Sequence, residues 1–391
     1  MSETALQSTA SPSATAGDVN DFAHTGPDAL AGKFARRFWH PVCLASAVQP
    51  GHIAKIRVLG EDINVYRGEG GTPHAVGYRC AHRGLQLTAG YVEGDDIRCP
   101  YHGWKYDPSG QCVEQPAEPK CFASRIKIPG YPTREYLGLI FVFMGEGDPP
   151  PFPEYPAFEG DAVIEAYQYM FEWNFYQHLE NSVDETHVIF LHERSAFSAL
   201  TPQVPIVECE ETDFGIAYHG TRKGGVRRTT YYQVPFLISF SRPPYLPDLE
   251  TQWRTALAWR VPADDENHHM FLVYRCEVQK DKVPEFRERM TAIFDNIARL
   301  KPDVELARDV LEGRLRMEDL PKRDDIVIVQ DQVAQLGQGA IVDRTAEHLS
   351  PVNDAVILLL RRIWRRELAA LRDGKPLKQW ESTIPLPTSG L

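Results

Sequence analysis

Residues 80–104 read CAHRGLQLTAGYVEGDDIRCPYHGW and contain two pairs of potential metal ligands, Cys80 with His82 and Cys99 with His102. Cysteine thiolates and histidine imidazoles together suit zinc, or an iron–sulfur cluster in which two histidines replace two cysteines on one iron. Each pair offers one cysteine and one histidine. Two loops could therefore place both thiolates on one iron and both imidazoles on the other.

The residues around these pairs favour a buried cluster. Such a cluster needs loops that approach each other closely and exclude water, and the glycines and proline that permit this are Gly84, Gly90, Pro100 and Gly103. Tyr101 and Trp104 would shield the cluster from solvent. A zinc site and a chance grouping of ligand-type residues are the alternatives, and the agreement of spacing with flanking residues favours the cluster.

A second stretch, residues 174–192 (NFYQHLENSVDETHVIFLH), contains His187 and His192. Two histidines and one carboxylate on one face of an iron, with other positions open, prepare Fe(II) to bind O₂. Asp184 and His187 are spaced i, i+3 and share a helix face, so they could form a hydrogen bond. The two histidines are spaced i, i+5, about 140° apart on a regular helix. The helix must therefore widen or end between them if both bind one metal.

Both stretches resemble the metal motifs of the Rieske non-haem iron ring-hydroxylating oxygenases. The matching residues are Cys80-Ala-His82-Arg-Gly84 and Cys99-Pro-Tyr-His102-Gly-Trp-Lys-Tyr-Asp107 for the 2Fe–2S cluster, and Asn181, Asp184, His187 and His192 for the mononuclear iron. The resemblance implies a third iron ligand, an aspartate far downstream. We expect Asp325 in RDDIVIVQDQ (residues 323–332), with Asp324 as the alternative, because Gln330 follows at the family's spacing.

The late stretch VDRTAEHLSPVNDAVILLLRR (residues 342–362) resembles the C-terminal signature of the phthalate-type branch of this family. The resemblance implies the oxygenase (alpha) subunit of a homotrimer, in which the cluster of one subunit serves the iron of the next. Asp184 would then bridge His102 of the partner subunit and His187 of its own chain. The expected electron source is an NADH-dependent reductase, directly or through a ferredoxin, because no glycine-rich nucleotide fingerprint is found in this chain.

The expected activity is therefore that of a terminal oxygenase that uses O₂ to hydroxylate a small aromatic compound, an aromatic acid or a heteroaromatic, by ring dihydroxylation. Oxidative O- or N-dealkylation of an aromatic ether or amine by the same site is the alternative. A Rieske electron-transfer protein without oxygenase activity is a more distant one, because such a carrier needs neither a large second domain nor the second set of ligands.

The domain organisation is read from turn signals and periodicity. Short β-like runs between residues 36 and 146 predict an all-β Rieske domain, and the stretch GEGDPPPFPEYP (residues 145–156) cannot continue a sheet or helix. Residues 147–391 mix antiparallel strand and helix patterns, which predicts an α+β catalytic domain, helix-grip by resemblance. Residues 1–35 are expected to be a disordered tail and a lead-in.

Composition excludes several other classes. The formal net charge of −12 argues against nucleic-acid binding. Seven cysteines form no disulfide framework and fit reduced thiols, and neither a signal peptide nor an apolar run long enough for a membrane span is found. We therefore expect a cytoplasmic protein.

Other polar residues could line a site. Arg227 and Arg228 could bind a substrate carboxylate, although a solvated strand face is the simpler interpretation. His178 lies two and a half helical turns from His187, and His268-His269 follows an acidic stretch typical of a hairpin turn, so neither is expected to bind metal. The aromatic segment 233–245 could line a pocket or pack in the core.

Overall fold

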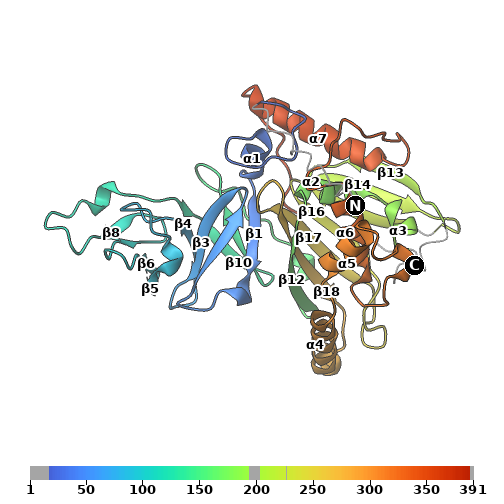
Figure 1. The fold of residues 1–391 in the computed structure, drawn as a ribbon, viewed down its shortest axis with the longest axis horizontal. Helices are drawn as coiled ribbons and strands as arrows, with labels where there is room; N and C mark the ends of the chain where they lie inside the picture. Colours follow the sequence, from blue (N-terminus) through green and yellow to red (C-terminus); the bar gives the residue numbers. More distant parts are fainter. Residues whose placement is uncertain (1–16, 193–202, 226, 388–391) are drawn as a thin grey trace, which may run out of the picture.

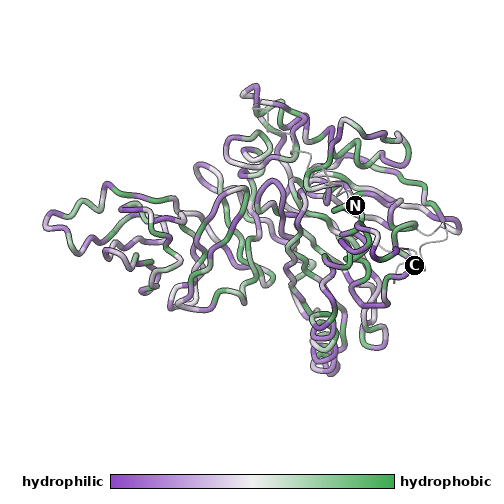
Figure 2. Tube along the Cα trace, viewed as in Figure 1, coloured by the Kyte–Doolittle hydropathy of each residue, from purple (hydrophilic) through white to green (hydrophobic). Residues whose placement is uncertain are grey.

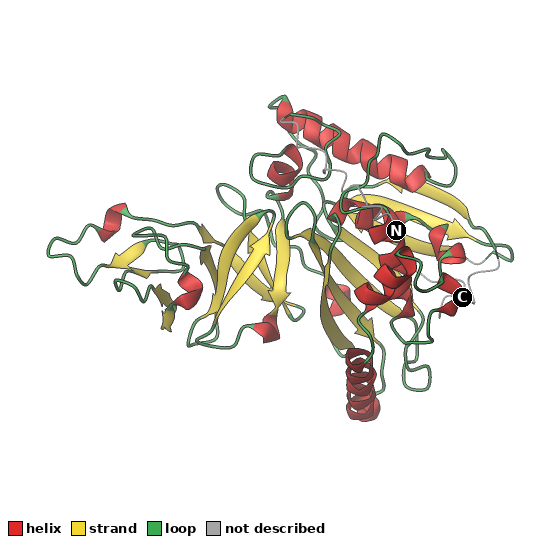
Figure 3. Ribbon diagram, in the orientation of Figure 1, coloured by secondary structure: helices red, strands yellow, loops and turns green. Residues whose placement is uncertain are grey.

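A computed structural model describes residues 17–192, 203–225 and 227–387. The N-terminal part consists of three small antiparallel sheets (Figures 1 and 3). The first has the order β1-β11-β10 (Trp39–Leu44, Leu139–Phe143, Thr133–Tyr136). The second is β2-β3-β4-β9 (Ile53–Val58, Glu61–Arg67, Pro73–Gly77, Gly130–Tyr131), and the third is β5-β6-β7-β8 (Tyr91–Glu93, Asp96–Arg98, Lys105–Tyr106, Cys112–Glu114).

The C-terminal part is built on a seven-stranded antiparallel sheet of order β12-β18-β17-β16-β15-β14-β13. Its strands are β12 Val163–Phe171, β13 Ile206–Glu211, β14 Gly215–Thr221, β15 Arg227–Gln233, β16 Leu237–Arg242, β17 Arg254–Pro262 and β18 His268–Cys276. The helices around it are α2 Phe175–Val183, α3 His187–Phe190, α4 Val283–Arg299, α5 Asp303–Leu311, α6 Ile326–Gly337 and α7 Ala355–Arg372. This is the expected α+β architecture.

The two faces of the large sheet have different partners. Side chains alternate between the faces of a strand. On β18, Met270 and Leu272 pack toward α4, whereas Phe271 and Val273 join the core that reaches α7 and the N-terminal sheets. The face with Met270 and Leu272 therefore packs against helices and lines a cavity. The face with Phe271 and Val273 holds the two parts of the chain together.

Two segments that look like single elements in the sequence, one helical and one strand-like, are each divided into two elements at a proline. The helical periodicity of residues 284–311 becomes α4 and α5, because Pro302 has no N–H to donate and restricts the residue before it. The strand-like run TTYYQVPFLISF becomes β15 and β16, with Val234 and Pro235 at the turn.

The junction between the two parts contains backbone hydrogen bonds and aromatic contacts. The N–H groups of Leu59 and Gly60 donate to the carbonyls of Pro262 and Ala263, at 2.8 and 2.9 Å. Hydrophobic segments alternate with hydrophilic ones through both parts (Figure 2). One continuous buried cluster includes residues from each part, so the two parts share a core.

The lead-in to the first sheet is packed against the C-terminal part. The ring of Phe22 stacks on Tyr176 of α2 with ring centroids 4.8 Å apart, and α1 (Leu30–Ala35) contacts α7. Residues 1–16, which hold most of the expected disordered tail, lie outside the described residues.

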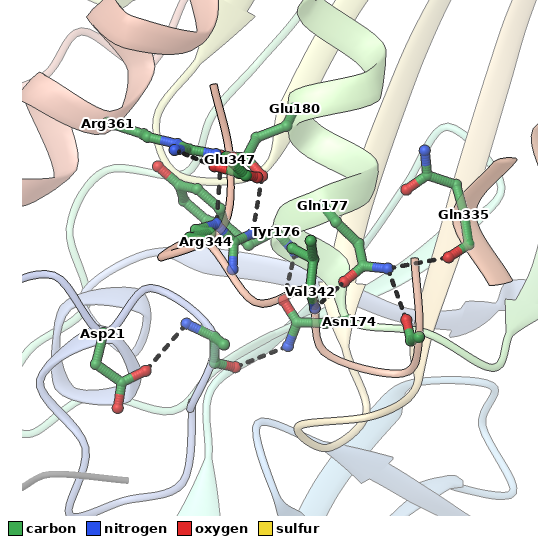
Figure 4. Close-up of polar contacts among 12 residues, drawn as sticks. Asp21, Asn174, Tyr176, Gln177, Glu180, Gln335, Val342, Arg344, Glu347 and Arg361 are labelled. Atoms are coloured by element: carbon green, nitrogen blue, oxygen red, sulfur yellow. Dashed lines mark hydrogen bonds and ion pairs between the residues drawn. The ribbon is translucent and has the colours of Figure 1, made fainter. Parts of the chain in front are cut away.

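A polar network fixes α2 from its outer side (Figure 4). Asn174 caps the helix by accepting a hydrogen bond from the N–H of Tyr176 at 2.9 Å. Gln177 donates to the Gly339 carbonyl at 3.0 Å. Glu180, which is buried, forms ion pairs with Arg344 at 2.8 Å and with Arg361. The stretch that resembles a C-terminal family signature thus holds the helix that leads to the second metal motif.

No helix among the described residues is both long and apolar enough to cross a membrane.

Candidate metal centres and cavity

The two Cys/His loops of the N-terminal part have the same backbone design. Cys80 and Cys99 each donate their N–H to the carbonyl five residues ahead, at 2.8 and 2.9 Å. Gly84 and Gly103 donate back to the carbonyls of these cysteines, at 2.9 and 3.1 Å, with φ of 73° and 76°. Only glycine adopts such left-handed conformations without cost. A Cβ on Gly103 would also lie 2.6 Å from Pro116, so this turn requires glycine for two reasons, the left-handed backbone and the close contact.

The loops bury their thiols and leave their imidazoles partly exposed. Cys80 and Cys99 are 3% and 1% exposed. The rings of His82 and His102 lie 4.3 Å apart, and Trp104 stacks on His82 at 4.6 Å. Nδ1 of His82 is buried without a hydrogen-bond partner, a cost that coordination of a metal would remove.

The buried thiols have polar support. Tyr106 accepts a hydrogen bond from the N–H of Ala81 at 3.1 Å, so its own O–H can donate to Sγ of Cys80 at 3.2 Å. Burial raises the pKa of Cys99, against the opposing effect of the backbone N–H groups of Tyr101 and His102. A thiol in this position stays protonated unless a metal replaces the proton. These two thiols and two imidazoles therefore fit the 2Fe–2S cluster inferred from sequence.

The second candidate centre joins helix α3, the segment that follows it and helix α6. Oδ1 of Asp331 on α6 lies 3.2 Å from Nε2 of His192 and 3.9 Å from Nε2 of His187. Each residue offers a ligand atom, and these three atoms lie within 4.8 Å of one another. His192 also contacts Gln330 through Nδ1 at 3.0 Å, which fixes its ring and leaves Nε2 for a metal. Two neutral imidazoles and one carboxylate are the donor set that suits Fe(II) with open positions.

The geometry differs from the expectation for the third ligand: among the described residues, the structure brings Asp331 to the histidines, and neither Asp325 nor Asp324. Asp325 lies just before the first residue of α6 and pairs with Arg323, with Oδ2 and Nη2 2.6 Å apart. Asp331 is six residues further, about 9 Å along the helix axis. Both aspartates lie in the stretch singled out by sequence, but Asp331 lies inside the helix and Asp325 at its start.

Helix α3 ends at Phe190, so the helix ends between the two histidines as expected. A second break lies before His187, at residues 184–186 between α2 and α3. Asp184 causes it in part, because its Oδ1 accepts a hydrogen bond from the N–H of Thr186 at 2.7 Å, outside the helical pattern. The short α3 then turns His187 and His192 toward each other, with ring centroids 5.2 Å apart.

Asp184 and Asn181 lie beside the ligands. Oδ2 of Asp184 is 3.6 Å from Nδ1 of His187, longer than a hydrogen bond, and this buried Nδ1 has no other partner. Burial raises the pKa of Asp184, but the contacts with His187 and with backbone N–H groups outweigh it and lower the pKa overall. Asn181 donates to Oδ1 of Asp331 at 3.3 Å.

A cavity opens beside the three candidate ligands, between the large sheet and helices α2, α4 and α6. Its wall is mostly aromatic and apolar, as ligand pockets usually are. The apolar lining includes Phe171, Trp173, Phe240, Met270, Leu272 and Phe294. In the aromatic segment at residues 233–245, Ile238, Phe240, Arg242 and Tyr245 line the cavity, and Val234, Phe236 and Leu237 pack in the core.

Three arginines line the cavity. Arg228 pairs with the buried Glu185 at 3.0 Å. Arg242 donates to the hydroxyl of Tyr274 at 2.8 Å. Arg260 is 5% exposed and donates to the Ala258 carbonyl at 2.9 Å, while its Nε has no hydrogen-bond partner. Burial lowers the pKa of Arg260 to about 10, with Asp331 acting in the opposite direction, so the group stays charged at neutral pH.

Sequence reasoning missed one further residue of this wall, His178, and its buried partner His268. His268 starts β18 directly after the hairpin turn, is fully buried, and contacts His178 of α2 at 2.6 Å. His178 lies in the cavity wall. Its position one helical turn before Asn181 and Ser182 is the sequence signal that could have indicated this.

Comparisons with known proteins agree with the two centres. Residues 38–132 match the Rieske [2Fe-2S] domain family. The oxygenase subunit of 5,5'-dehydrodivanillate O-demethylase from Sphingobium sp. is 28% identical, over 95% of this chain and 86% of that protein. Phenoxybenzoate dioxygenase subunit alpha from Ectopseudomonas oleovorans is 29% identical, over 88% and 83%.

Solved structures show the same fold. The structure of Pseudomonas putida CBB5 NdmA with caffeine matches with a TM-score of 0.65 at 21% identity, covering 91% of this chain and 97% of that one. The terminal oxygenase of carbazole 1,9a-dioxygenase from Nocardioides aromaticivorans IC177 matches with a TM-score of 0.62 at 21% identity, covering 87% and 97%.

The fold and the two donor sets thus define an iron-dependent oxygenase subunit with an N-terminal iron–sulfur domain. The chain contains a Rieske [2Fe-2S] domain and is similar over most of its length to oxygenase alpha subunits of Rieske non-haem iron oxygenases, whose cofactors are a Rieske 2Fe–2S cluster and a mononuclear iron.

Proposed function

We propose that this protein is the terminal oxygenase of a system that hydroxylates a small aromatic compound with O₂ and two electrons from NADH. The observation that carries this proposal is the group of His187, His192 and Asp331 at the wall of an aromatic-lined cavity. When bound there, iron supplies an open site that binds and activates O₂. The protein positions an aromatic ring beside that site and excludes water from it.

Each candidate ligand has a role in this proposal. Cys80 and Cys99 hold one iron of the cluster, and His82 and His102 hold the other. His187, His192 and Asp331 hold the mononuclear iron, with Asp331 replacing the expected Asp325. Their burial and mutual distances support these roles.

The neighbours of the iron ligands have roles of their own. Asn181 orients Asp331 through the amide hydrogen bond. Asp184 connects the iron site to the cluster of the partner subunit, as the family resemblance implies. The observation that supports this role is that its carboxylate, whose pKa is lowered, adjoins Nδ1 of His187.

The charge of the cavity favours an aromatic acid as substrate. Fe(II) with one carboxylate ligand leaves a net positive centre, and Arg242 and Arg260 add two cations to the same wall. A substrate carboxylate would offset this charge and would give Nε of Arg260 a partner. The relatives point the same way, since their names include phenoxybenzoate, 3-chlorobenzoate and phthalate dioxygenases.

Oxidative dealkylation is the second candidate, and the similarity to an O-demethylase oxygenase subunit favours it. Hydroxylation of a methyl group beside oxygen gives a hemiacetal that releases formaldehyde, whereas ring attack retains every carbon of the substrate. The same cavity could orient either position toward the iron, so the product distinguishes the two reactions.

The electron path in this proposal runs through a separate NADH-dependent reductase, directly or through a ferredoxin, and between subunits of a homotrimer. The cluster loops lie at one end of the molecule, beyond β4, and α3 lies toward the other (Figure 1). This separation supports transfer between neighbouring subunits. A similar structure, the oxygenase of carbazole 1,9a-dioxygenase, is known in complex with a ferredoxin.

The test combines metal analysis with turnover. Electron paramagnetic resonance of the dithionite-reduced protein should show a Rieske cluster, and iron analysis should give three irons per chain. Turnover of a panel of benzoates, phenoxybenzoates and methoxybenzoates under ¹⁸O₂, with a reductase and NADH, should label the product of at least one compound. Two irons per chain with no labelled product would instead identify an electron carrier.

A further inference from the structure

Two buried histidines form a hydrogen-bond chain that ends in the cavity. Nδ1 of His268 lies 2.7 Å from the carbonyl oxygen of Trp173, and Nε2 of His268 lies 2.6 Å from Nδ1 of His178. His268 is 0% and His178 is 5% exposed, and His178 lines the cavity. Neither histidine is one of the candidate iron ligands.

The chain fixes the position of each proton. A carbonyl oxygen can only accept, so Nδ1 of His268 carries hydrogen and donates to Trp173. In a neutral ring Nε2 is then an acceptor, and Nδ1 of His178 must donate to it. The remaining nitrogen, Nε2 of His178, is therefore an unprotonated acceptor.

Both rings are held neutral by their surroundings. Burial lowers the pKa of His268 to about 3, with the charge of Arg260 adding to the effect. Burial, Arg260 and the other histidines lower the pKa of His178 in the same direction. Phe171 packs edge-on against the ring of His178 at 5.2 Å, which limits its rotation.

We propose that His178 is a positioning residue whose Nε2 accepts a hydrogen bond from an O–H or N–H group of the substrate. Among the residues that the structure describes, none donates to this atom, and His178 lines the cavity, so a substrate group can supply the donor. Arg260 and Arg242 offer only donors, so this imidazole nitrogen adds a neutral acceptor to a wall that also presents cationic donors. This inference deepens the proposed function and rests on it: the favoured substrate is an aromatic acid that also carries a hydrogen-bond donor, such as a phenol.

The test compares ligand pairs that differ in this donor alone. Binding of 2-, 3- and 4-hydroxybenzoate and of the matching methoxybenzoates is measured by calorimetry on the anaerobic holoprotein. We expect the wild type to bind the hydroxy member of at least one pair tenfold or more tighter. His178→Phe should reduce this preference to less than threefold while the affinity for the methoxy member stays within threefold.

Two further variants separate the hydrogen-bond chain from general packing. His268→Leu releases the fixed proton of His178, so the preference should fall as in His178→Phe. His269→Gln changes the next residue of β18, which contacts Gln168 and does not line the cavity, and it should keep the wild-type preference. A wild type without preference in any pair, or a His178→Phe variant that retains it, overturns the proposal. Because binding is measured without turnover, absence of oxygenase activity would count against the proposed function alone.

Discussion

Oδ1 of Asp331 lies 3.2 Å from Nε2 of His192, although 139 positions separate the two residues in the chain. The contact joins the middle of α6 to the segment after α3, across one wall of the cavity. Helix α2, on the other side, is fixed by Glu180 and its two arginine partners. The candidate iron site is therefore held by packed helices, which keeps its geometry constant when substrate enters.

Substitution of Asp331 should remove the mononuclear iron without affecting the cluster. In Asp331→Ala we expect one iron per chain to be lost, the Rieske spectrum to be unchanged and oxygenation to be abolished, because the cluster lies in other sheets. Asp325→Asn is the matched control, since it breaks the pair with Arg323 but leaves the iron site intact. It should lower the melting temperature and retain full iron content. Loss of iron in Asp325→Asn with retention in Asp331→Ala would restore the original expectation.

Cys80→Ser and His102→Cys should remove or alter the cluster and leave the mononuclear iron bound. The reason is that both residues lie in loops of the N-terminal sheets, which are separate from the large sheet. Visible absorption and paramagnetic resonance report the cluster, and iron analysis reports the second site. Full turnover of Cys80→Ser with its reductase would contradict the assignment.

Tyr106→Phe should lower the reduction potential of the cluster while the cluster stays bound. The hydroxyl of Tyr106 donates to Sγ of Cys80, and a hydrogen bond to sulfur stabilises the reduced, more negative state. A hydrogen bond of about 1 kcal/mol corresponds to a shift on the order of tens of millivolts. Protein-film voltammetry measures the shift, and an unchanged potential would show that the hydroxyl only supports the N–H of Ala81.

Asp184→Asn should separate metal content from electron transfer. The amide keeps the size and the contact with the Thr186 N–H, but it loses the charge beside His187. We expect both metals to remain and oxidation of the pre-reduced protein by O₂ with substrate to slow by orders of magnitude. A wild-type single-turnover rate at unchanged metal content would reject the connecting role.

The parts of this protein that the sequence predicted are those with short, local patterns. The Cys80 and Cys99 loops each contain their whole hydrogen-bond design within six residues, so their spacing, flanking residues and family resemblance together indicated the cluster. Asp331 could not be predicted from a local pattern. Asp324 and Asp325 at the start of α6 fit the expected ligand spacing, and only the packing of α6 against α3 shows which aspartate lies beside the histidines. His178 and His268 were missed for the same reason: their contact joins residues 90 positions apart, on elements whose pairing no local pattern specifies.

His40 should make the protein sensitive to mild acid. Its Nε2 donates to the Ala35 carbonyl at 2.7 Å, its Nδ1 is buried without a partner, and its ring packs against Phe236. Burial, with Arg36 adding and the Ala35 hydrogen bond opposing, lowers its pKa to about 4 from the ordinary 6.5. A proton on Nδ1 would be a buried donor without an acceptor.

The sign of the effect follows from proton binding. Between pH 6.5 and 4 the unfolded chain binds a proton at His40 and the folded chain does not. Stability from this residue is therefore present above pH 6.5 and is lost as the pH falls toward 4, by about 1.4 kcal/mol per pH unit. His40→Gln should be less stable than wild type at pH 7.5 but should lose less stability on going to pH 5. Melting temperatures of wild type and variant across this range measure the difference, with exposed His52→Gln as the control that should follow the wild type. Parallel pH curves for wild type and His40→Gln would show that His40 does not set the acid sensitivity.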